Sequence, residues 1–234
     1  MIDDQGKPAG CYTEEMAKRT VYCEEALTWL SRQNGLDDAS VITSLPDVSE
    51  TMLSLSNWKV WFSETVALLI QKCPEEAAVI FYQTDIKRDG EWIDKSYLCH
   101  QGASSAGGRL LWHKIACRRP AGSVTFGRPG YAHLVCYSRG LKADLSKSTA
   151  DVLPNTGQMT WSRATGVEAC RVACKFVLSS TSTRTIVDPF CGHGTILAVA
   201  NAMNLDAIGV DHSRRRCARA RTLNLDISIL SNHH

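Results

Sequence analysis

Short apolar runs alternate with amphipathic stretches along this chain. Residues 39–43 and 77–83 are apolar runs of strand length, whereas residues 58–72 place apolar side chains at the three- and four-residue spacing of a helix. The same pattern predicts, in chain order, a short apolar segment at 21–23, a helix at 24–33, strands at 110–117 and 131–137, a helix at 167–178, a strand ending at 186–187, a helix at 196–203 and a strand at 207–210.

This alternation of strands and helices predicts an α/β fold with a doubly wound, mostly parallel sheet. The strands at 110–117 and 131–137 are joined by a loop rich in Gly and Pro, so we expect them to pair as an antiparallel hairpin near the edge of that sheet. The segment 85–93 is a polar excursion containing Asp89-Gly90, and the segment 143–161 is polar and irregular.

Two loops follow predicted inner strands and are therefore candidates for ligand binding. The loop 44–47 reads Ser-Leu-Pro-Asp, and the loop 188–195 reads Asp-Pro-Phe-Cys-Gly-His-Gly-Thr. Ligands of doubly wound sheets bind beyond the carboxyl ends of the central strands, where the winding reverses. If both strands are central and adjacent, the two loops face each other across one crevice.

The glycine-containing loop predicts a nucleoside-binding turn between a strand and a helix. Gly192 and Gly194 allow the backbone to turn tightly against a ligand, and Asp211 follows the glycines by about twenty residues, the offset that presents an acid to ribose hydroxyls. A dinucleotide fingerprint would need a third glycine where the chain has Leu197, so a pyrophosphate is not implied. The alternative is that Asp188 and Pro189 merely shape a turn.

Composition favours one intracellular globular domain spanning residues 1–234. The chain is 44% hydrophobic with a net charge of +2, contains no apolar run of membrane-spanning length, and starts with a polar segment, Met1 to Lys7, unlike a signal peptide. A cytoplasmic or nuclear location is expected. The terminal His233 and His234 are interpreted as a tail, for which a truncated purification tag is one origin.

The ten cysteines include no Cys-x-x-Cys pair, which favours reduced, buried thiols. Cys170 and Cys174 lie one helical turn apart, and Cys117 lies four residues after His113. Neither pair has two further ligands at a regular spacing, so we expect no metal site.

The acid-first loop D-P-F-x-G-x-G-T at 188–195 resembles motif I of methyltransferases that depend on S-adenosylmethionine (SAM). This resemblance implies that Asp188 lies near the amino-acid end of SAM, that the backbone of Gly192 and Gly194 lies against it, and that Asp211 holds the ribose. It also implies cofactor contacts by Pro189, Phe190, Cys191, Thr195 and His212.

The order of motifs, with a proline-containing loop early and the SAM loop at 185–211 late, resembles the circularly permuted amino-methyltransferases of the β class. These enzymes are best known from DNA adenine and cytosine modification, and the resemblance implies their Rossmann-like fold. The helix that begins near Thr165 would then cradle SAM. Glu25, in preference to Glu24, would lie near the adenine amine.

The catalytic loop, within residues 42–50, departs from the family pattern D/N/S-P-P-Y/F/W. Ser44 matches an allowed hydrogen-bond acceptor, the Leu45 carbonyl and Pro46 keep their places, but Asp47 replaces the aromatic residue that stacks on an extruded base. We hypothesise that Asp47, helped by Ser44, is a general base suited to an acidic ring N–H of uracil or guanine. The alternative is that Asp47 caps the following segment, with Ser49 and Glu50 doing similar local work.

Basic residues gather in the loop region 109–147, where only Asp144 opposes them, and such a lobe suits a phosphate backbone. The cluster comprises Lys114, Arg118, Arg119, Arg128, Arg139, Lys142 and Lys147. A second group of arginines at 214–221 is interpreted as a solvated helix face. Trp58 and Trp61 are expected to be core residues rather than base-stacking platforms.

The sequence therefore predicts a SAM-dependent methyltransferase that modifies a nitrogen of a nucleic-acid base. RNA is favoured over DNA because no separate target-recognition domain is visible. Two alternatives remain open: a methyltransferase acting on a protein or small molecule, and a catalytically silent RNA-binding scaffold.

Overall fold

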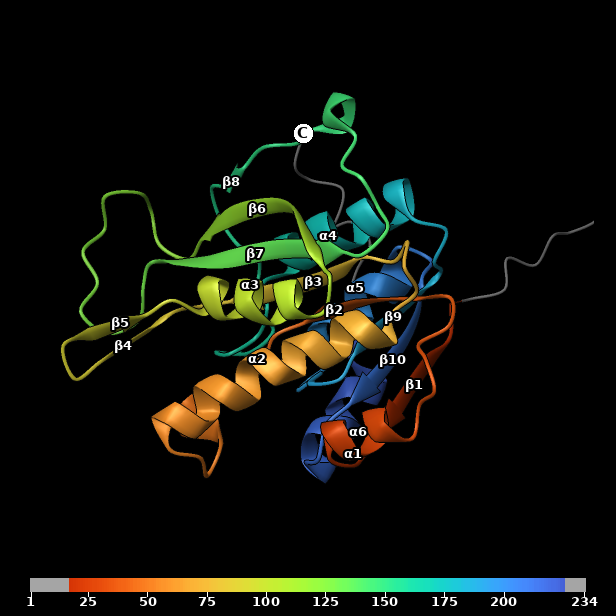
Figure 1. The fold of residues 1–234 in the computed structure, drawn as a ribbon, viewed down its shortest axis with the longest axis horizontal. Coiled ribbons are helices and arrows are strands. Elements are labelled where there is room, and N and C mark those ends of the chain that lie inside the picture. Colours follow the sequence, from red (N-terminus) through yellow and green to blue (C-terminus); the bar gives the residue numbers. More distant parts are fainter. Residues whose placement is uncertain (1–16, 226–234) are drawn as a thin grey trace, which may run out of the picture.

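The computed structural model describes residues 17–225, which form one α/β sandwich around a central eight-stranded sheet (Figure 1). The strands lie in the order β1-β10-β9-β2-β3-β7-β6-β8. The main-sheet strands are β1 (Arg19–Tyr22), β2 (Ala39–Thr43), β3 (Val79–Gln83), β6 (Arg109–Cys117), β7 (Tyr131–Ser138), β8 (Val152–Leu153), β9 (Thr185–Asp188) and β10 (Asp206–Val210). The predicted α/β class is confirmed.

Five neighbouring strands, from β1 to β3, run parallel, and β7 pairs antiparallel with both β3 and β6. The predicted antiparallel hairpin is thus confirmed. The short strand β8 pairs parallel with β6 and lies outside it. The hairpin is therefore next to the edge of the sheet rather than at it.

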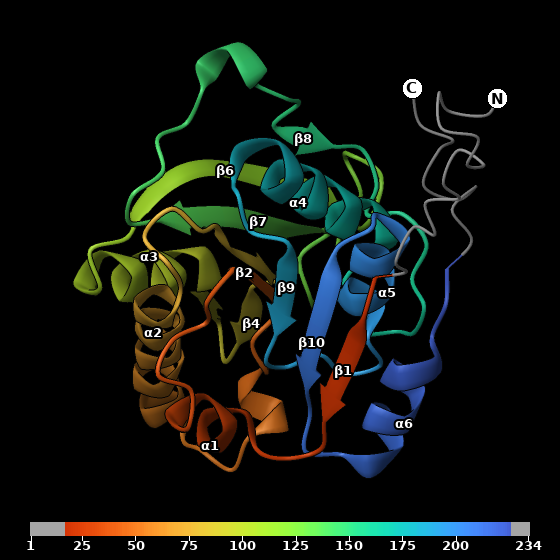
Figure 2. The same ribbon diagram turned by 90° about the vertical axis from the view of Figure 1, so that its right-hand side faces the viewer.

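Helices cover both faces of the sheet (Figure 2). One face carries α1 (Ala26–Ser31), α2 (Leu55–Lys72) and α3 (Lys95–Ser105), and the other carries α4 (Val167–Ser180), α5 (Thr195–Ala202) and α6 (Arg214–Thr222). Each layer forms its own apolar core, because alternate residues of a buried strand point to opposite faces: Val79 and Phe81 belong to one cluster, Ile80 and Tyr82 to the other.

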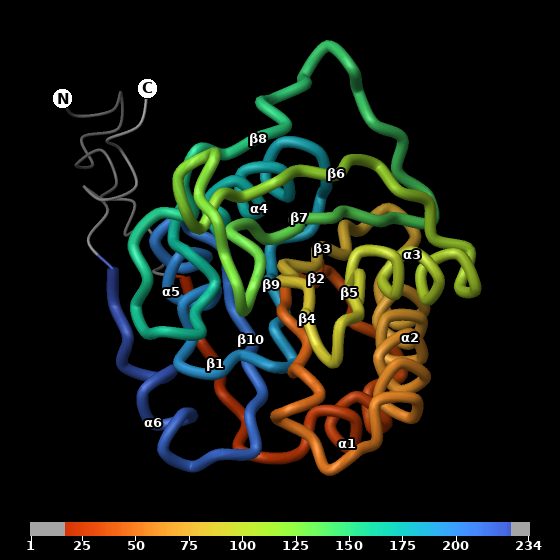
Figure 3. Tube along the Cα trace, turned by 90° about the vertical axis from the view of Figure 1, so that its left-hand side faces the viewer, coloured from red at the N-terminus to blue at the C-terminus, as the bar shows by residue number. Residues whose placement is uncertain are grey.

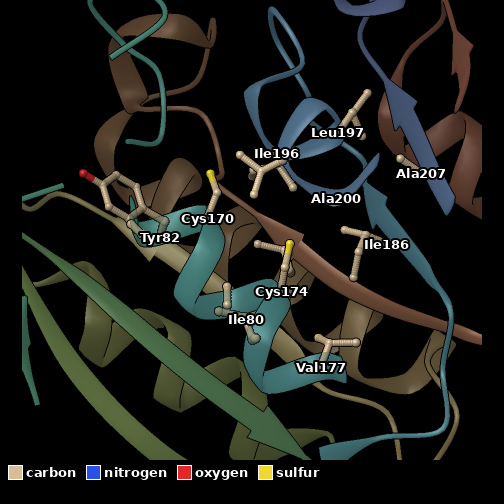
Figure 4. Close-up of a cluster of buried hydrophobic side chains, with 14 of the residues drawn as sticks. Ile80, Tyr82, Cys170, Cys174, Val177, Ile186, Ile196, Leu197, Ala200 and Ala207 are labelled. Atoms are coloured by element: carbon tan, nitrogen blue, oxygen red, sulfur yellow. The ribbon is translucent and has the colours of Figure 1, made fainter. Parts of the chain in front are cut away.

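Figure 4 shows the α4–α5 core, in which Cys170 and Cys174 pack among Ile80, Val177 and Ile196. Both thiols are fully buried, and burial raises the pKa of Cys174 to about 12. These two cysteines behave as small apolar side chains of the core, as expected.

Helix α3 is absent from the elements that the sequence predicts. It begins after Asp94, whose carboxylate accepts the backbone N–H of Tyr97 at 2.9 Å, and it packs closely against α2. A Cβ at Gly102 would lie 2.2 Å from the Ser63 carbonyl oxygen, so the close approach of the two helices requires glycine. Packing on α2 offsets the poor helical propensity of this segment.

The polar segment before α3 forms a separate hairpin of β4 (Ile86–Arg88) and β5 (Glu91–Ile93). Its turn residues Asp89 and Gly90 have φ values of 52° and 80°, as a tight hairpin turn demands. Two short 3-10 helices complete the structure, at Val48–Glu50 and Leu145–Lys147. None of the helices between residues 17 and 225 could cross a membrane. Met1 to Lys7, His233 and His234 lie outside the described residues.

Candidate active site

The two candidate loops meet at the carboxyl edge of adjacent parallel strands. β2 and β9 pair in register with Val41 opposite Val187, so both strands end at the same side of the sheet. The hydroxyl of Thr43, the last residue of β2, donates a hydrogen bond of 2.7 Å to Oδ1 of Asp188, the last residue of β9. The crevice that the sequence predicts between the two loops is present.

A cavity of about 320 Å³ lies at this edge, a volume within the usual range for small-molecule sites. It is bordered by residues of both loops, by the end of β10 and by the start of α1. Among the residues predicted to hold a cofactor, those that border it are Glu25, Thr165, Asp188, Pro189, Phe190, Cys191, Gly192, Thr195, Asp211 and His212. Segments from both ends of the chain therefore build one binding site.

Asp188 is buried at the base of this cavity. Its carboxylate accepts the Thr43 hydroxyl and the backbone N–H of Phe190, the latter at 3.2 Å. Burial dominates over these two hydrogen bonds and raises the pKa of Asp188 to about 7, and the neighbouring Asp211 raises it further. A cationic ligand group beside Asp188 would favour its charged form.

The two glycines of the loop have different roles. Gly192 borders the cavity with φ +54°, whereas Gly194, with φ +82°, is the residue before α5 and does not border it. A Cβ at Gly194 would lie 2.8 Å from Cα of Ala220 in α6. Gly194 therefore turns the chain against a neighbouring helix, and its expected contact with the cofactor stays a prediction.

Asp211 follows β10, the strand next to β9, and is buried at the border of the cavity. It accepts the backbone N–H of Ser213 at 2.7 Å, and Arg216 lies 3.6 Å from its other oxygen. Glu25 borders the same cavity from the N-terminus of α1, where its carboxylate accepts the Thr28 N–H at 2.7 Å. The carboxylates of Asp211 and Glu25 thus border the same cavity as Asp188.

Sequence reasoning missed one wall of the cavity. Trp161 stacks on His193 with ring centroids 4.4 Å apart, and the Arg216 guanidinium lies 5.8 Å from the Trp161 ring. Trp161 comes from the segment dismissed as irregular, and Arg216 from the helix interpreted as a solvated face. A tryptophan isolated among polar residues was the only available signal for this wall.

The Ser-Leu-Pro-Asp loop separates this cavity from a second one. Ser44, Leu45 and Pro46 border the first cavity, and the indole of Trp58 donates to the Pro46 carbonyl oxygen at 3.1 Å. Trp58 is fully buried, which confirms it as core, whereas Trp61 borders the first cavity, edge-on to Phe190.

Asp47 does not border the first cavity. It is buried, and its two carboxylate oxygens are bonded separately to the ammonium of Lys95, from α3, and to the guanidinium of Arg128, from the loop between β6 and β7. The carboxylate of Glu50 accepts the backbone N–H of Asp47 at 3.1 Å, which is the local capping role considered for Glu50. Both oxygens of Asp47 are therefore already engaged by cations.

The second cavity adjoins the first, because the two share Ser44, Leu45, Glu50, Arg163 and Ala164. Its remaining border comes from the end of β3 and from the basic residues around Asp47. These residues are Asp47, Tyr82, Gln83, Thr84, Lys95, Arg118 and Arg128. Four basic side chains and two carboxylates thus surround a second space next to Ser44.

The basic region 109–147 does not act as a single surface. Arg118 and Arg128 border the second cavity, but Lys114 is buried and donates to the Thr149 and Ala150 carbonyl oxygens at 3.0 Å each. Arg139 similarly donates to the Cys73 carbonyl oxygen at 2.7 Å. The prediction of one phosphate-binding lobe is therefore wrong for Lys114 and Arg139, because their charged groups donate hydrogen bonds to backbone carbonyl oxygens of the fold.

Comparison with known proteins agrees with this geometry. The family model N6_N4_Mtase, DNA methylase, matches residues 174–222, which contain both buried acids of the first cavity. The cytosine-N4-specific PvuII DNA methyltransferase aligns with a TM-score of 0.69 at 12% identity, covering 92% of this chain and 90% of that chain. No curated protein matches.

Two further solved structures were determined with SAM. A Thermus thermophilus protein described as a DNA modification methylase, complexed with S-adenosyl-L-methionine, aligns with a TM-score of 0.64 at 13% identity, covering 86% of this chain and 91% of that chain. The M1.HpyAVI–SAM complex aligns with a TM-score of 0.57 at 11% identity, covering 87% of this chain and 97% of that chain.

The chain has the Rossmann-like methyltransferase fold, with a mixed, mostly parallel sheet like that of the PvuII enzyme. The segment holding its cofactor loop is similar to the N6/N4 DNA methylases. The expected preference for RNA gains no support, since the family model and two of the three structures are named for DNA.

Proposed function

We propose that this protein is a SAM-dependent methyltransferase that modifies a nitrogen of a base in DNA. The observation that carries the proposal is the position of Asp188: a buried carboxylate at the base of a cavity that Asp211 also borders, beside the Ser44 loop. This placement matches the three needs of the reaction, namely a cation-binding end, a ribose-binding end and an acceptor loop.

The residues of the first cavity fit the chemistry of SAM. Asp188 would hold the cationic amino group, because it is buried without a basic partner among residues 17–225, which leaves its charge uncompensated. Asp211 would accept hydrogen bonds from the ribose hydroxyls, and Glu25, or the adjacent Glu24, from the adenine amine. Gly192 and Phe190 supply the backbone and the apolar wall between these ends. SAM, when bound, provides a methyl group on a sulfonium, ready for in-line displacement.

The Ser44 loop would orient the acceptor. Ser44 and Leu45 border both cavities, so a heterocycle in the second cavity meets these two residues where it approaches the first. The Ser44 hydroxyl and the Leu45 carbonyl would accept hydrogen bonds from the N–H groups of the reacting nitrogen. These bonds would direct its lone pair toward the first cavity. The protein contributes position above all.

Asp47 has a different role in this proposal from the general base suggested by its sequence position. Lys95 and Arg128 occupy both of its oxygens, so we assign Asp47 to positioning: it anchors α3 and the β6–β7 loop around the acceptor cavity. The general-base hypothesis remains a prediction, and the pH profiles of Asp47→Asn and Arg128→Ala distinguish the two roles.

Nucleic acid as the acceptor is supported by the β6–β7 loop. Phe126 in this loop is 94% exposed and stands between the basic residues Arg119 and Arg128. Lys87 of the β4–β5 hairpin donates to the Thr125 carbonyl oxygen at 3.0 Å, so hairpin and loop lie side by side (Figure 3), and Arg128 of the same loop borders the second cavity. An exposed aromatic ring in a loop that also carries arginines suits base stacking and phosphate binding. DNA is preferred to RNA because of the names of the matching proteins.

Transfer of tritium from labelled SAM tests the proposal. The protein is incubated with genomic DNA, total RNA or mixed protein, and each pool is digested and analysed by mass spectrometry. Label in a methylated deoxynucleoside is the expected result. Label only in RNA or protein would refute the assignment to DNA, and SAM binding without transfer to any pool would favour the silent scaffold.

A further inference from the structure

The end of β3 carries polar groups that the fold does not satisfy. The side chain of Gln83 has no exposed surface, and neither its amide oxygen nor its amide nitrogen has a hydrogen-bond partner within residues 17–225. The hydroxyl of the preceding residue, Tyr82, is also buried without a partner in this part of the chain. Unpaired buried polar groups are costly and uncommon, so two successive ones call for an explanation.

Neighbouring residues of the same strand end are satisfied, so at this edge of the sheet the deficit is confined to Tyr82 and Gln83. Thr84 accepts a hydrogen bond of 3.3 Å from Arg118, and Asp85 accepts the backbone N–H of Lys95 at 2.9 Å and the His133 ring N–H at 3.0 Å. The fold therefore has donors available at this edge, yet none is directed at Gln83.

Gln83 and Tyr82 both border the second cavity, which adjoins the cofactor cavity at Ser44 and Leu45. Alternation along β3 places their side chains on opposite faces of the sheet, with the Tyr82 ring in the core beneath α4 and α5. In Figure 4 the Tyr82 hydroxyl oxygen is turned away from the apolar cluster that holds its ring. Burial raises the pKa of Tyr82 to about 12, which keeps this hydroxyl neutral and able to donate.

We propose that the second cavity, about 50 Å³ in this structure, is the inner end of an acceptor-base pocket that continues into the first cavity, and that Gln83 is the residue that selects its occupant. This inference rests on the proposed function. An amide presents one donor and one acceptor side by side, and it is complemented by a planar heterocycle that carries an N–H next to a ring nitrogen or carbonyl. A nucleobase has such an edge, whereas the ammonium of a protein lysine offers donors alone.

The selection acts through the polar groups that would be left unpaired. A site built to bond both atoms of an amide rejects an occupant that lacks the matching edge, because the buried amide stays unsatisfied. Ser44 and Leu45 then receive the reacting nitrogen while Gln83 fixes the ring. Gln83 is thus a specificity-determining residue of the transfer.

Replacement of Gln83 by methionine removes both polar atoms and keeps the length of the side chain. With tritiated SAM and heat-denatured genomic DNA or total RNA as probes, Gln83→Met should lower kcat/KM for transfer by about tenfold to hundredfold. SAM affinity by calorimetry should equal that of the wild type. Since the amide has no partner in the protein, the variant should melt at the same temperature or higher. Gln83→Glu, which loses the donor, should show a similar loss of transfer.

Gln71→Glu, at an exposed position on α2, is the matched control and should leave all three measurements unchanged. Transfer by Gln83→Met at the wild-type kcat/KM would overturn the inference. A fall of several degrees in its melting temperature would also overturn it, because the amide would then be satisfied within the fold. Wild-type protein that binds SAM but labels neither nucleic acid would instead refute the proposed function.

Discussion

The buried carboxylate of Asp188 should lower the folding stability of the cofactor-free protein relative to a variant with a neutral side chain at this position. Burial raises the pKa of this carboxyl from 3.8 to about 7, roughly three units, and each unit corresponds to about 1.4 kcal/mol. At pH 8, where the group is charged in both states, burial of the charge costs about 4 kcal/mol of folding stability. Asp188→Asn removes the charge while keeping an oxygen that can accept the Thr43 hydroxyl and the Phe190 N–H.

The sign of the pH dependence follows from the direction of the shift. Between pH 4 and pH 7 the folded protein binds a proton at Asp188 that the unfolded chain has lost, so the unfolding free energy falls as pH rises through this window and then levels off. The variant should lack this component. At pH 8 it should therefore be more stable than the wild type by up to about 4 kcal/mol.

Urea unfolding of the cofactor-free protein between pH 5 and pH 8 measures this effect. Asp37→Asn, an exposed aspartate, is the control. In calorimetry at pH 8 the same Asp188→Asn variant should bind SAM about 30-fold more weakly or worse, because a buried charge pair is lost. The affinity of the wild type should fall by up to about tenfold for each pH unit below 7. A variant that is less stable than the wild type at pH 8 would refute the reasoning.

Three further predictions concern the remaining parts of the site. Asp211→Ala should weaken SAM binding by about tenfold to hundredfold in calorimetry, as expected for lost charge-assisted hydrogen bonds, and unchanged affinity would remove Asp211 from the ribose site. Asp47→Asn should lower kcat with SAM affinity intact. If Asp47 positions Arg128, then Arg128→Ala should reproduce that loss with the same pH profile, whereas a general base would show a pH profile altered only by the Asp47 variant. Phe126→Ala should weaken binding of single-stranded DNA by about tenfold in fluorescence anisotropy and leave SAM binding unchanged; equal DNA affinity would exclude stacking by this ring.

Much of the fold could be predicted because inner strands of a parallel sheet are apolar on both faces. Strand β2 was predicted with its bounds, and β3 and β7 within two residues, since nothing but burial explains such runs. Helix α3 was missed because Lys95–Ser105 has no apolar stripe and contains Gly102. Its position depends on contact with α2, which a local pattern does not carry.

The cofactor half of the site was predictable and the acceptor half was not. Asp188 and Asp211 belong to one continuous motif, so their spacing is visible in the sequence. The second cavity combines Asp47, Gln83 and Arg128, which lie far apart in the chain, and of these only Asp47 belongs to a motif that the sequence analysis singles out. Gln83 looked like the end of an apolar strand, and only the missing hydrogen-bond partners distinguish it.

The strand order also determines how the nascent chain can fold. Thr43 and Asp188 are 145 positions apart, and β2 lies between β9 and β3. During translation one edge of β2 therefore stays unpaired until β9 is made near the end of synthesis. β1 likewise stays unpaired until β10 is made. A ribosome that stops early would release a chain with open hydrogen-bonding edges and no cofactor pocket, a species prone to aggregation. Loss of the last quarter would remove two strands from the interior of the sheet and would leave β1 without a partner.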